Sequence, residues 1–87
     1  MSLSNSSEST RMSVIEAILA ERERQDKIWG VQDHDDSWWN IITVERNGDI
    51  AREVYGQNET KLFIELIQTC ATYLAWAEAV RRRYKNG

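Results

Sequence analysis

The sequence contains no proline and a single cysteine, Cys70. One cysteine cannot form an internal disulfide, and its apolar neighbours Leu66, Ile67 and Leu74 predict a buried thiol in a reducing compartment. Long hydrophobic runs are also absent: none approaches the ~18 residues of a membrane-spanning helix, and residues 1–10 lack an apolar signal core. We therefore expect a cytoplasmic protein that does not enter a membrane.

Basic residues are also fewer than acidic ones. The chain carries 11 Lys and Arg residues against 14 Asp and Glu residues, which gives a formal net charge of −3. Because general nucleic-acid binding requires Lys and Arg to neutralise many phosphates, this balance argues against a nucleic-acid partner. The one basic run, "RRRYK" at residues 81–85, closes the last apolar-periodic segment, where cations complement the carbonyl end of a helix. An anion-binding tail is the alternative interpretation of this run.

The length of 87 residues allows one domain. A chain this short buries only about 60% of the surface that its unfolded form exposes, which favours self-association. We expect residues 1–12, which are rich in serine, to be disordered. Residues 13–85 are expected to form a single helical domain.

Local signals place the first helix and the loop after it. Ser13 and Glu16 match the Ser-x-x-Glu capping pattern, which predicts that a helix begins at Ser13. Apolar residues then recur at helical spacing until Gly30 ends the segment. The polar stretch that follows has no periodicity and is expected to be a loop, with Asp36 or Ser37 capping the next helix.

The segment 38–55 gives conflicting signals. The β-branched run "IITV" followed by Asn47-Gly48 is typical of a hairpin turn. The residues after the turn, however, place Ile50 and Val54 four apart, which favours a helix. We expect the helix, although a glycine in its interior costs about 1 kcal/mol. That cost suggests that another backbone or a ligand approaches Gly48 closely.

The third segment is the clearest helix. Asn58 is placed to cap it, and residues 59–84 contain neither glycine nor proline. A polar stripe runs beside its apolar face, and it is expected to be either half-buried and hydrogen-bonded or an ordinary solvated flank. The stripe consists of Glu65, Gln68, Thr69, Thr72 and Trp76.

Carboxylates are spaced for one face of the second helix. Glu45, Asp49 and Glu53 follow one another at intervals of four residues, an arrangement typical of a metal site, although Arg46 stands among them. Glycine-rich phosphate loops, Cys/His zinc spacings and the Ser-Asp-His order of α/β hydrolases are absent.

Three stretches in order, "ERERQDKIWGVQDHDDSWW", "ITVERNGDIARE" and "LFIELIQTCATYLAWAEAVRRR", carry a resemblance to a family. Over about residues 14–83 the chain resembles the short MazG-like members of the all-α nucleoside triphosphate pyrophosphohydrolases. The resemblance implies an all-α fold of three main helices, and two chains are expected to form a helical bundle by dimerisation. The expected assembly is a homodimer or a dimer of dimers.

The resemblance also implies a metal site. In the family, one helix carries Glu-Glu-x-Gly-Glu, the next carries Glu-x-x-Asp, and the facing carboxylates hold Mg²⁺. The implied ligands of Mg²⁺, or of Mn²⁺ in its place, are Glu45, Asp49, Glu65 and Gln68, with Glu45 and Glu65 catalytic. The family also keeps a glycine inside this helix, at the position of Gly48.

This chain departs from the family motif at three positions. Arg46 replaces the second glutamate, Asp49 is shorter than the third, and Gln68 replaces the final aspartate. A guanidinium among the ligands lowers their affinity for a cation and can take over part of its charge-balancing role. We therefore expect one ion rather than two.

Nucleotide recognition is expected around the first loop. Trp29, His34 and Trp38 are placed to stack on a base, Lys27 to meet a phosphate, and Arg46 to reach the acidic cleft. The alternatives are that the tryptophans belong to the core or the dimer interface and that His34 is simply solvated.

The implied function is Mg²⁺-dependent hydrolysis of a nucleoside triphosphate to the monophosphate and pyrophosphate, of the house-cleaning type. The partner would be the triphosphate, with no nucleic acid and no membrane. Two alternatives stay open. One is a catalytically degenerate homologue that binds nucleotide, and the other is a structural helical oligomerisation module.

Overall fold

The computed structural model describes residues 2–86, with side-chain environments for residues 7–85. It contains three helices, α1 (Ser2–Trp29), α2 (Asp36–Gly56) and α3 (Glu59–Asn86), and no strand in the described range. The all-α prediction with three main helices is therefore confirmed. Within the same range, no helix combines the length and the apolar character needed to cross a membrane.

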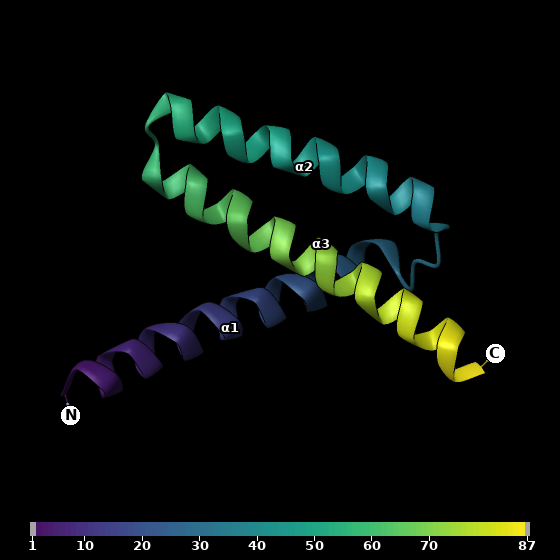
Figure 1. Ribbon diagram of the computed structural model, residues 1–87, viewed down its shortest axis with the longest axis horizontal. Coiled ribbons are helices and arrows are strands. Elements are labelled where there is room, and N and C mark those ends of the chain that lie inside the picture. The colour runs from purple at the N-terminus through teal and green to yellow at the C-terminus, as the bar shows by residue number, and fades with distance from the viewer. Residues whose placement is uncertain (1, 87) are drawn as a thin grey trace.

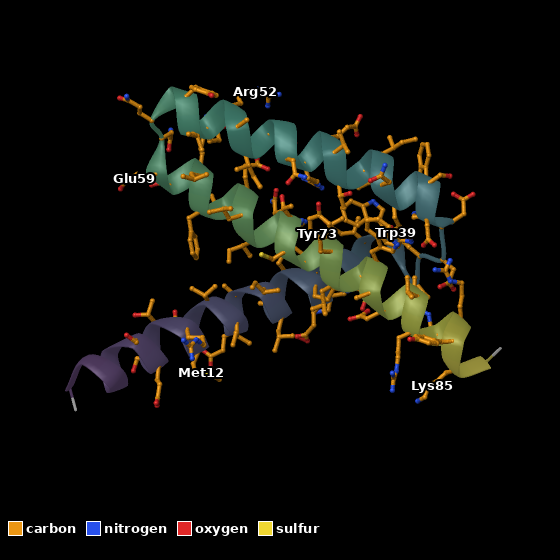
Figure 2. All side chains as sticks on the ribbon, in the orientation of Figure 1. Met12, Trp39, Arg52, Glu59, Tyr73 and Lys85 are labelled. Atoms are coloured by element: carbon orange, nitrogen blue, oxygen red, sulfur yellow. The ribbon has the colours of Figure 1, made fainter. Side chains whose placement is uncertain are left out.

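α3 is the central element of the fold. It lies antiparallel beside α2 and is crossed by α1, and it packs against both (Figure 1). The N-terminal half of α1 extends away from the other two helices, and Met12 lies on this extended part (Figure 2). The described molecule measures 46 × 33 × 21 Å along its principal axes, so it is elongated.

The start of α1 differs from the prediction. The structure describes Ser2–Trp29 as one helix, so Ser13 lies in its interior and is not an N-cap. The stretch before Ser13 contains neither glycine nor proline, the two strongest helix breakers, although its Ser and Asn residues are weak helix formers. The structure includes residues 2–12 in α1, Met1 lies outside the described residues, and the expected disorder of residues 1–12 stays a prediction. The assignment of a domain to residues 13–85 stays a prediction.

The turn from α1 into α2 has a definite geometry at both ends. Gly30 adopts a left-handed φ of 71°, and its N–H donates to the carbonyl of Asp26 at 2.8 Å, which confirms that Gly30 ends α1. Asp35, rather than Asp36 or Ser37, caps α2. Its backbone is extended (φ −72°, ψ 163°), and its side chain accepts the N–H of Trp38 at 3.0 Å.

α2 runs through Asn47-Gly48 without interruption, so the helix interpretation is confirmed. It ends at Gly56 and is followed by Gln57 in the left-handed region (φ 57°). Asn58 then caps α3 as predicted, because its Oδ1 accepts the N–H of Lys61 at 3.0 Å.

No other part of the described chain approaches Gly48 closely, so the predicted approach of a ligand or of another chain's backbone stays a prediction. A Cβ built on Gly48 would meet no atom within 4 Å outside its own helix backbone and its chain neighbours. Gly48 also has no positive φ that would require glycine. Neither the packing nor the backbone of this single chain therefore explains the residue.

The core lies where small residues of α3 meet α2. Trp39 is 1% exposed and packs against Ala75 and Ala79, with Ile42 and Trp76 at the margin (Figure 2). The alanines lack bulk, so they leave room for the large indole of α2. Trp39 is thus a core anchor, whereas Trp29 and Trp38, for which a core position was the alternative interpretation, are 52% and 50% exposed.

The polar stripe of α3 is half-buried, as the first of the two interpretations held. Thr69 and Thr72 are buried, and the hydroxyl of Thr72 donates to the carbonyl of Gln68 at 2.9 Å. Cys70, by contrast, is exposed, so the predicted burial of its thiol is wrong. Its neighbour Leu66 is exposed too, because no other part of the described chain covers this face of α3.

Candidate functional site

A cavity of about 620 Å³ lies where the end of α1, the loop 30–35, α2 and α3 meet. Its lining combines aromatic rings, amide side chains and guanidinium groups. Prominent lining residues are Arg22, Gln25, Trp29, His34, Trp39 and Arg46. A concave surface with flat rings and positive charge suits a ligand that is both planar and anionic.

The three aromatic residues predicted to stack on a base are only partly brought together. Trp29 and His34 line the cavity, and the indole of Trp29 is 52% exposed. Trp38 does not line it, but lies with His34 around a separate shallow depression. The His34 ring meets the indole of Trp39 edge-on, with 5.0 Å between the ring centres. Trp39, which the sequence prediction did not name, therefore lines the cavity, whereas Trp38, which was expected to stack on the base, does not.

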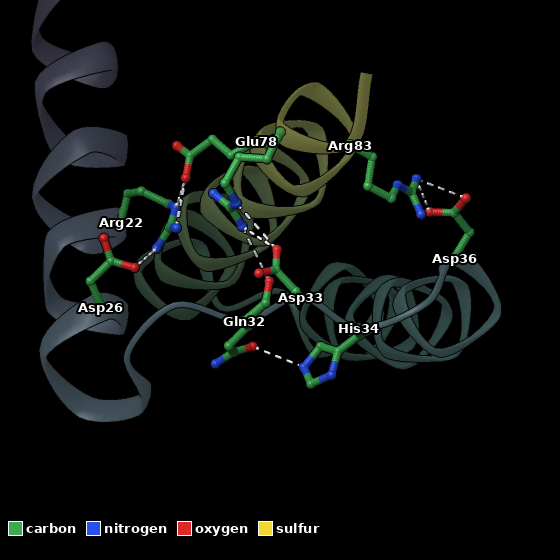
Figure 3. A network of polar contacts seen from close by, with 9 residues as sticks. Arg22, Asp26, Gln32, Asp33, His34, Asp36, Glu78 and Arg83 are labelled. Atoms are coloured by element: carbon green, nitrogen blue, oxygen red, sulfur yellow. Dashed lines mark hydrogen bonds and ion pairs between the residues drawn. The ribbon is translucent and has the colours of Figure 1, made fainter. Parts of the chain in front are cut away.

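Two guanidinium groups line the cavity, and only one of them is paired with carboxylates. The side chain of Arg22 is 12% exposed and is fully engaged: it donates to Asp26 at 2.7 Å and to Glu78 at 2.7 and 3.2 Å (Figure 3). Arg46 forms no ion pair within residues 7–85, and its Nη1 donates to Oε1 of Gln68 at 3.5 Å. Arg46 thus carries the positive charge that is available to an anionic ligand.

The charge of Arg46 also reaches the α1 side of the cavity. The pKa of Glu21 is lowered, mainly by a hydrogen bond from Arg24 and to a smaller extent by the charge of Arg46. Lys27, which was expected to meet a phosphate, is exposed on the last turn of α1 and does not line the cavity. Of the basic residues named from the sequence, Arg46 alone is at the cavity.

The four predicted metal ligands are in unlike environments. Glu45 is exposed, and Asp49 is paired with Arg52 at 2.9 Å. Glu65 has a buried Oε1 that receives no hydrogen bond, whereas the side-chain oxygen of Gln68 accepts from Arg46. Within the described part of the chain, no group of three or more His, Cys, Asp or Glu side chains is arranged to hold a metal ion.

The antiparallel register of α2 and α3 pairs two of these acids, Asp49 and Glu65, along the helix axes. Arg46 of α2 lies opposite Gln68 of α3. Moving three residues forward on α2 and three back on α3 places Asp49 opposite Glu65, because antiparallel helices keep the sum of paired numbers constant. A buried carboxylate oxygen without a donor is costly, and a hard cation would satisfy it. Of the two acids, Glu65 alone has a buried oxygen that lacks a partner, since Asp49 is already paired with Arg52.

Further buried polar atoms around the same interface have no partner. Besides Glu65 Oε1, the indole N–H of Trp39 and the hydroxyl of Thr69 form no hydrogen bond. Gln25, which is buried on α1, donates weakly to Glu21 at 3.3 Å and to the carbonyl of Gln68 at 3.5 Å. Native proteins seldom leave such groups unsatisfied, so their concentration here marks a region suited to ligand or ordered water.

Sequence reasoning missed Arg22, Gln25 and Trp39 as cavity residues. Arg22 and Asp26 are four apart, so half of the Arg22 network was visible in the sequence, but Glu78 is 56 positions away. Gln25 lies seven residues after Ile18 and four before Trp29, so it shares their helix face, and this position was a usable signal.

No protein-family model, no curated protein and no solved structure gives a significant match to this chain. The residues and their geometry therefore carry the functional proposal.

Proposed function

We propose that the chain binds a nucleoside triphosphate in the cavity and hydrolyses it to the monophosphate and pyrophosphate with Mg²⁺ or Mn²⁺. The observation that carries the proposal is the position of Arg46. Its guanidinium lines the aromatic cavity and at the same time contacts Gln68 in the cleft between α2 and α3. One ligand can therefore occupy the cavity with its ring and extend its phosphates toward the acids. The resemblance to short MazG-like pyrophosphohydrolases supports the same assignment.

Each group has a physical role in this proposal. Trp29 and His34 provide ring surfaces for the base. The fork of Arg46 suits phosphate oxygens, to which a guanidinium can bind through two N–H groups at once. Glu65 and Asp49 would hold the ion, which stabilises the charge that develops on the phosphates during hydrolysis. Glu45 is exposed one turn before Asp49 and is available to accept the proton of the attacking water.

Pyrophosphate release tests the reaction. The chain is incubated with each common ribo- and deoxyribonucleoside triphosphate, with Mg²⁺, with Mn²⁺ or with a chelator. Release of monophosphate and pyrophosphate in equal amounts is expected, and release of diphosphate and inorganic phosphate would contradict the proposed bond cleavage. Glu65→Gln is expected to lower the rate about 10–100-fold, in line with the loss of a group at a metal site. Glu16→Gln, a neutralised exposed acid on α1, is the matched control.

A second candidate function is nucleotide binding without hydrolysis. The contact between Arg46 and Gln68 favours it, because a cation occupies the region where the family motif has a metal ligand. Calorimetric titration with a non-hydrolysable triphosphate separates the candidates. Binding of the analogue with no pyrophosphate release from any triphosphate would support the second candidate and reject the first.

We also propose that the working form is a homodimer or a dimer of dimers. Large apolar side chains are exposed on all three helices of the single chain, which favours a further helix-to-helix contact. They include Met12, Ile15 and Leu19 on α1 and Phe63, Ile64 and Leu66 on α3. Light scattering after size exclusion should give about twice, or four times, the chain mass of 10.2 kDa. A mass equal to that of one chain at micromolar concentration would reject the proposal.

A further inference from the structure

The loop 30–35 forms one wall of the cavity. Gln32, Asp33 and His34 from this loop line the cavity together with its first two residues. The loop has no regular secondary structure, and most of its residues are exposed. Its internal bonds are few: Gly30 bonds back to α1, and the ring nitrogen Nε2 of His34 lies 3.2 Å from Oε1 of Gln32. Something outside the loop must therefore fix this wall in place.

The C-terminal turns of α3 supply that support. Arg82 donates from Nη2 and Nε to Oδ1 of Asp33, at 2.7 and 3.2 Å, and from Nη2 to the carbonyl of Gln32 at 3.5 Å. Arg83 donates from Nη2 to both carboxylate oxygens of Asp36, at 2.9 and 3.0 Å (Figure 3). The two adjacent guanidiniums thus hold the middle of the loop and the residue just beyond its end.

Helix geometry explains how neighbouring arginines reach two places. Successive residues of an α-helix point about 100° apart, so Arg82 and Arg83 diverge from α3 toward different parts of the chain. Through these two pairs the basic run "RRRYK" restrains the loop 30–35 and the start of α2. This role differs from both interpretations made from the sequence, a helix-dipole interaction and an anion-binding tail. Both guanidiniums already have carboxylate partners, so they are engaged within the chain.

We propose that Arg82 is a positioning residue for the cavity: with Asp33 it holds the loop 30–35 against α3, while Arg83 and Asp36 fix the start of α2. Gln32 and His34 are thereby kept in the cavity wall. The identity of the ligand rests on the proposed function, but the restraint on the loop does not. In this arrangement Arg82, which does not line the cavity, supports the cavity wall without touching the ligand.

The exposure of the pair predicts where its effect appears. The side chains of Arg82 and Asp33 are 38% and 63% exposed, and ion pairs this open contribute little to global stability. The loop, however, has few other restraints, so a small interaction is a large part of what keeps it closed. Removing the pair should therefore change the local opening of the loop and leave the melting temperature of the whole chain nearly unchanged.

The test compares Arg82→Gln with Arg81→Gln, in which a neighbouring exposed arginine loses the same charge. Amide hydrogen exchange is followed in peptides that cover the loop 30–35, with residues 62–72 of α3 as the internal reference. Arg82→Gln should raise the exchange rate of the loop by roughly three- to tenfold and leave the reference unchanged. Exchange in Arg81→Gln should equal that of the wild type.

Two further variants keep the test decisive if Arg82→Gln does not fold. Asp33→Asn removes the pair from the loop side, and it should reproduce the faster exchange. The double charge reversal Arg82→Asp with Asp33→Arg should restore slow exchange. The affinity for a non-hydrolysable triphosphate should fall by a factor similar to the change in exchange for Arg82→Gln, and the double reversal should recover it.

The outcomes separate this inference from the proposed function. Unchanged loop exchange in both Arg82→Gln and Asp33→Asn would overturn the inference, whatever the chain binds. Faster exchange with unchanged affinity for a bound triphosphate would overturn the positioning role. Faster exchange in a wild-type background that binds no triphosphate would reject the proposed ligand and leave the restraint on the loop supported.

Discussion

Arg46 of α2 and Gln68 of α3 contact each other across the helix interface, with Nη1 of the arginine 3.5 Å from Oε1 of the glutamine. Both residues stand where the motif of the MazG-like proteins has an acid, and the structure brings the two residues together. A long, weak hydrogen bond leaves most of the charge of the guanidinium uncompensated. Asp49 lies three residues after Arg46 on α2, and Glu65 lies three residues before Gln68 on α3. The charge of Arg46 therefore opposes the binding of a cation near these acids and favours an anion.

Replacing Arg46 by glutamate should therefore strengthen metal binding. Arg46→Glu removes the opposing charge and adds a carboxylate oxygen, so we expect the Mn²⁺ affinity to rise by about tenfold or more. Calorimetric titration of the wild type and the variant measures the change. Arg81→Glu alters the charge of an exposed arginine on α3 by the same amount and serves as the control. Equal affinities in the wild type and Arg46→Glu would contradict the prediction.

The three helices were predictable because their signals are local. Apolar residues at helical spacing, Gly30 after the first helix and Asn58 before the third are all visible in the sequence. The capping residue of α2 was not, since Asp35, Asp36 and Ser37 are chemically equivalent candidates. The backbone conformation of the loop decides among them, and it depends on how the loop is held.

The site was less predictable, because it depends on contacts between distant residues. The sequence identified Arg46 and Glu65 but could not give the direction of a side chain that lies about 100° from the acidic line. The pair of Arg82 and Asp33 is separated by 49 positions and has no sequence signature. The exposure of Cys70 depends on whether another part of the chain covers its face of α3, and the local spacing of residues does not show this.

Removing the unpartnered carboxylate of Glu65 should stabilise the chain. An unsatisfied buried oxygen costs about 1–3 kcal/mol, so Glu65→Leu should raise the free energy of unfolding by about 1 kcal/mol in a chelator. Urea unfolding measures the change. Glu45→Leu alters an exposed acid and should stay within about 0.5 kcal/mol of the wild type. Added Mg²⁺ should stabilise the wild type and not Glu65→Leu, because binding to the native state alone raises its stability. Destabilisation by Glu65→Leu in the chelator would show that the carboxylate has a partner.

The two adjacent tryptophans of α2 should respond very differently to truncation. Trp39 is 1% exposed and Trp38 is 50% exposed. Trp39→Ala should lower the free energy of unfolding by about 3–5 kcal/mol, because it opens a cavity in the core. Trp38→Ala should change it by less than about 1 kcal/mol. Urea unfolding followed by circular dichroism compares the two, and similar losses would contradict the assignment of Trp39 as the core anchor.

Acid should destabilise the start of α2. The N–H of Trp38 lowers the pKa of Asp35, and the indole N–H of Trp76, aided by Arg83, lowers the pKa of Asp36. The ordinary pKa of both groups is 3.8. A folded-state pKa below the unfolded value means that the unfolded chain binds protons more readily. The stabilisation is therefore fully present above pH 3.8 and is lost as the pH falls through the lowered values.

Asp35→Asn tests this pH dependence with little change to the helix cap. Asparagine caps helices about as well as aspartate but does not titrate. The variant should match the wild type at pH 7 in urea unfolding and lose less stability as the pH falls below 3.8. Parallel pH profiles of the two proteins would show that Asp35 makes no contribution.

The single chain does not explain why residue 48 is a glycine, and replacing Gly48 tests whether a second chain or a ligand does. It lies inside α2 with helical backbone angles, and a Cβ at this position would meet no atom within 4 Å. Gly48→Ala should therefore stabilise the chain by about 1 kcal/mol, the difference in helix propensity. Urea unfolding at low protein concentration measures it, and Ala51→Gly, an exposed position on the same helix, should give a loss of similar size. If Gly48→Ala destabilises the protein or lowers its mass in light scattering, a second chain approaches α2 at this point. If it leaves both unchanged or improved but abolishes triphosphate binding, the glycine makes room for the ligand.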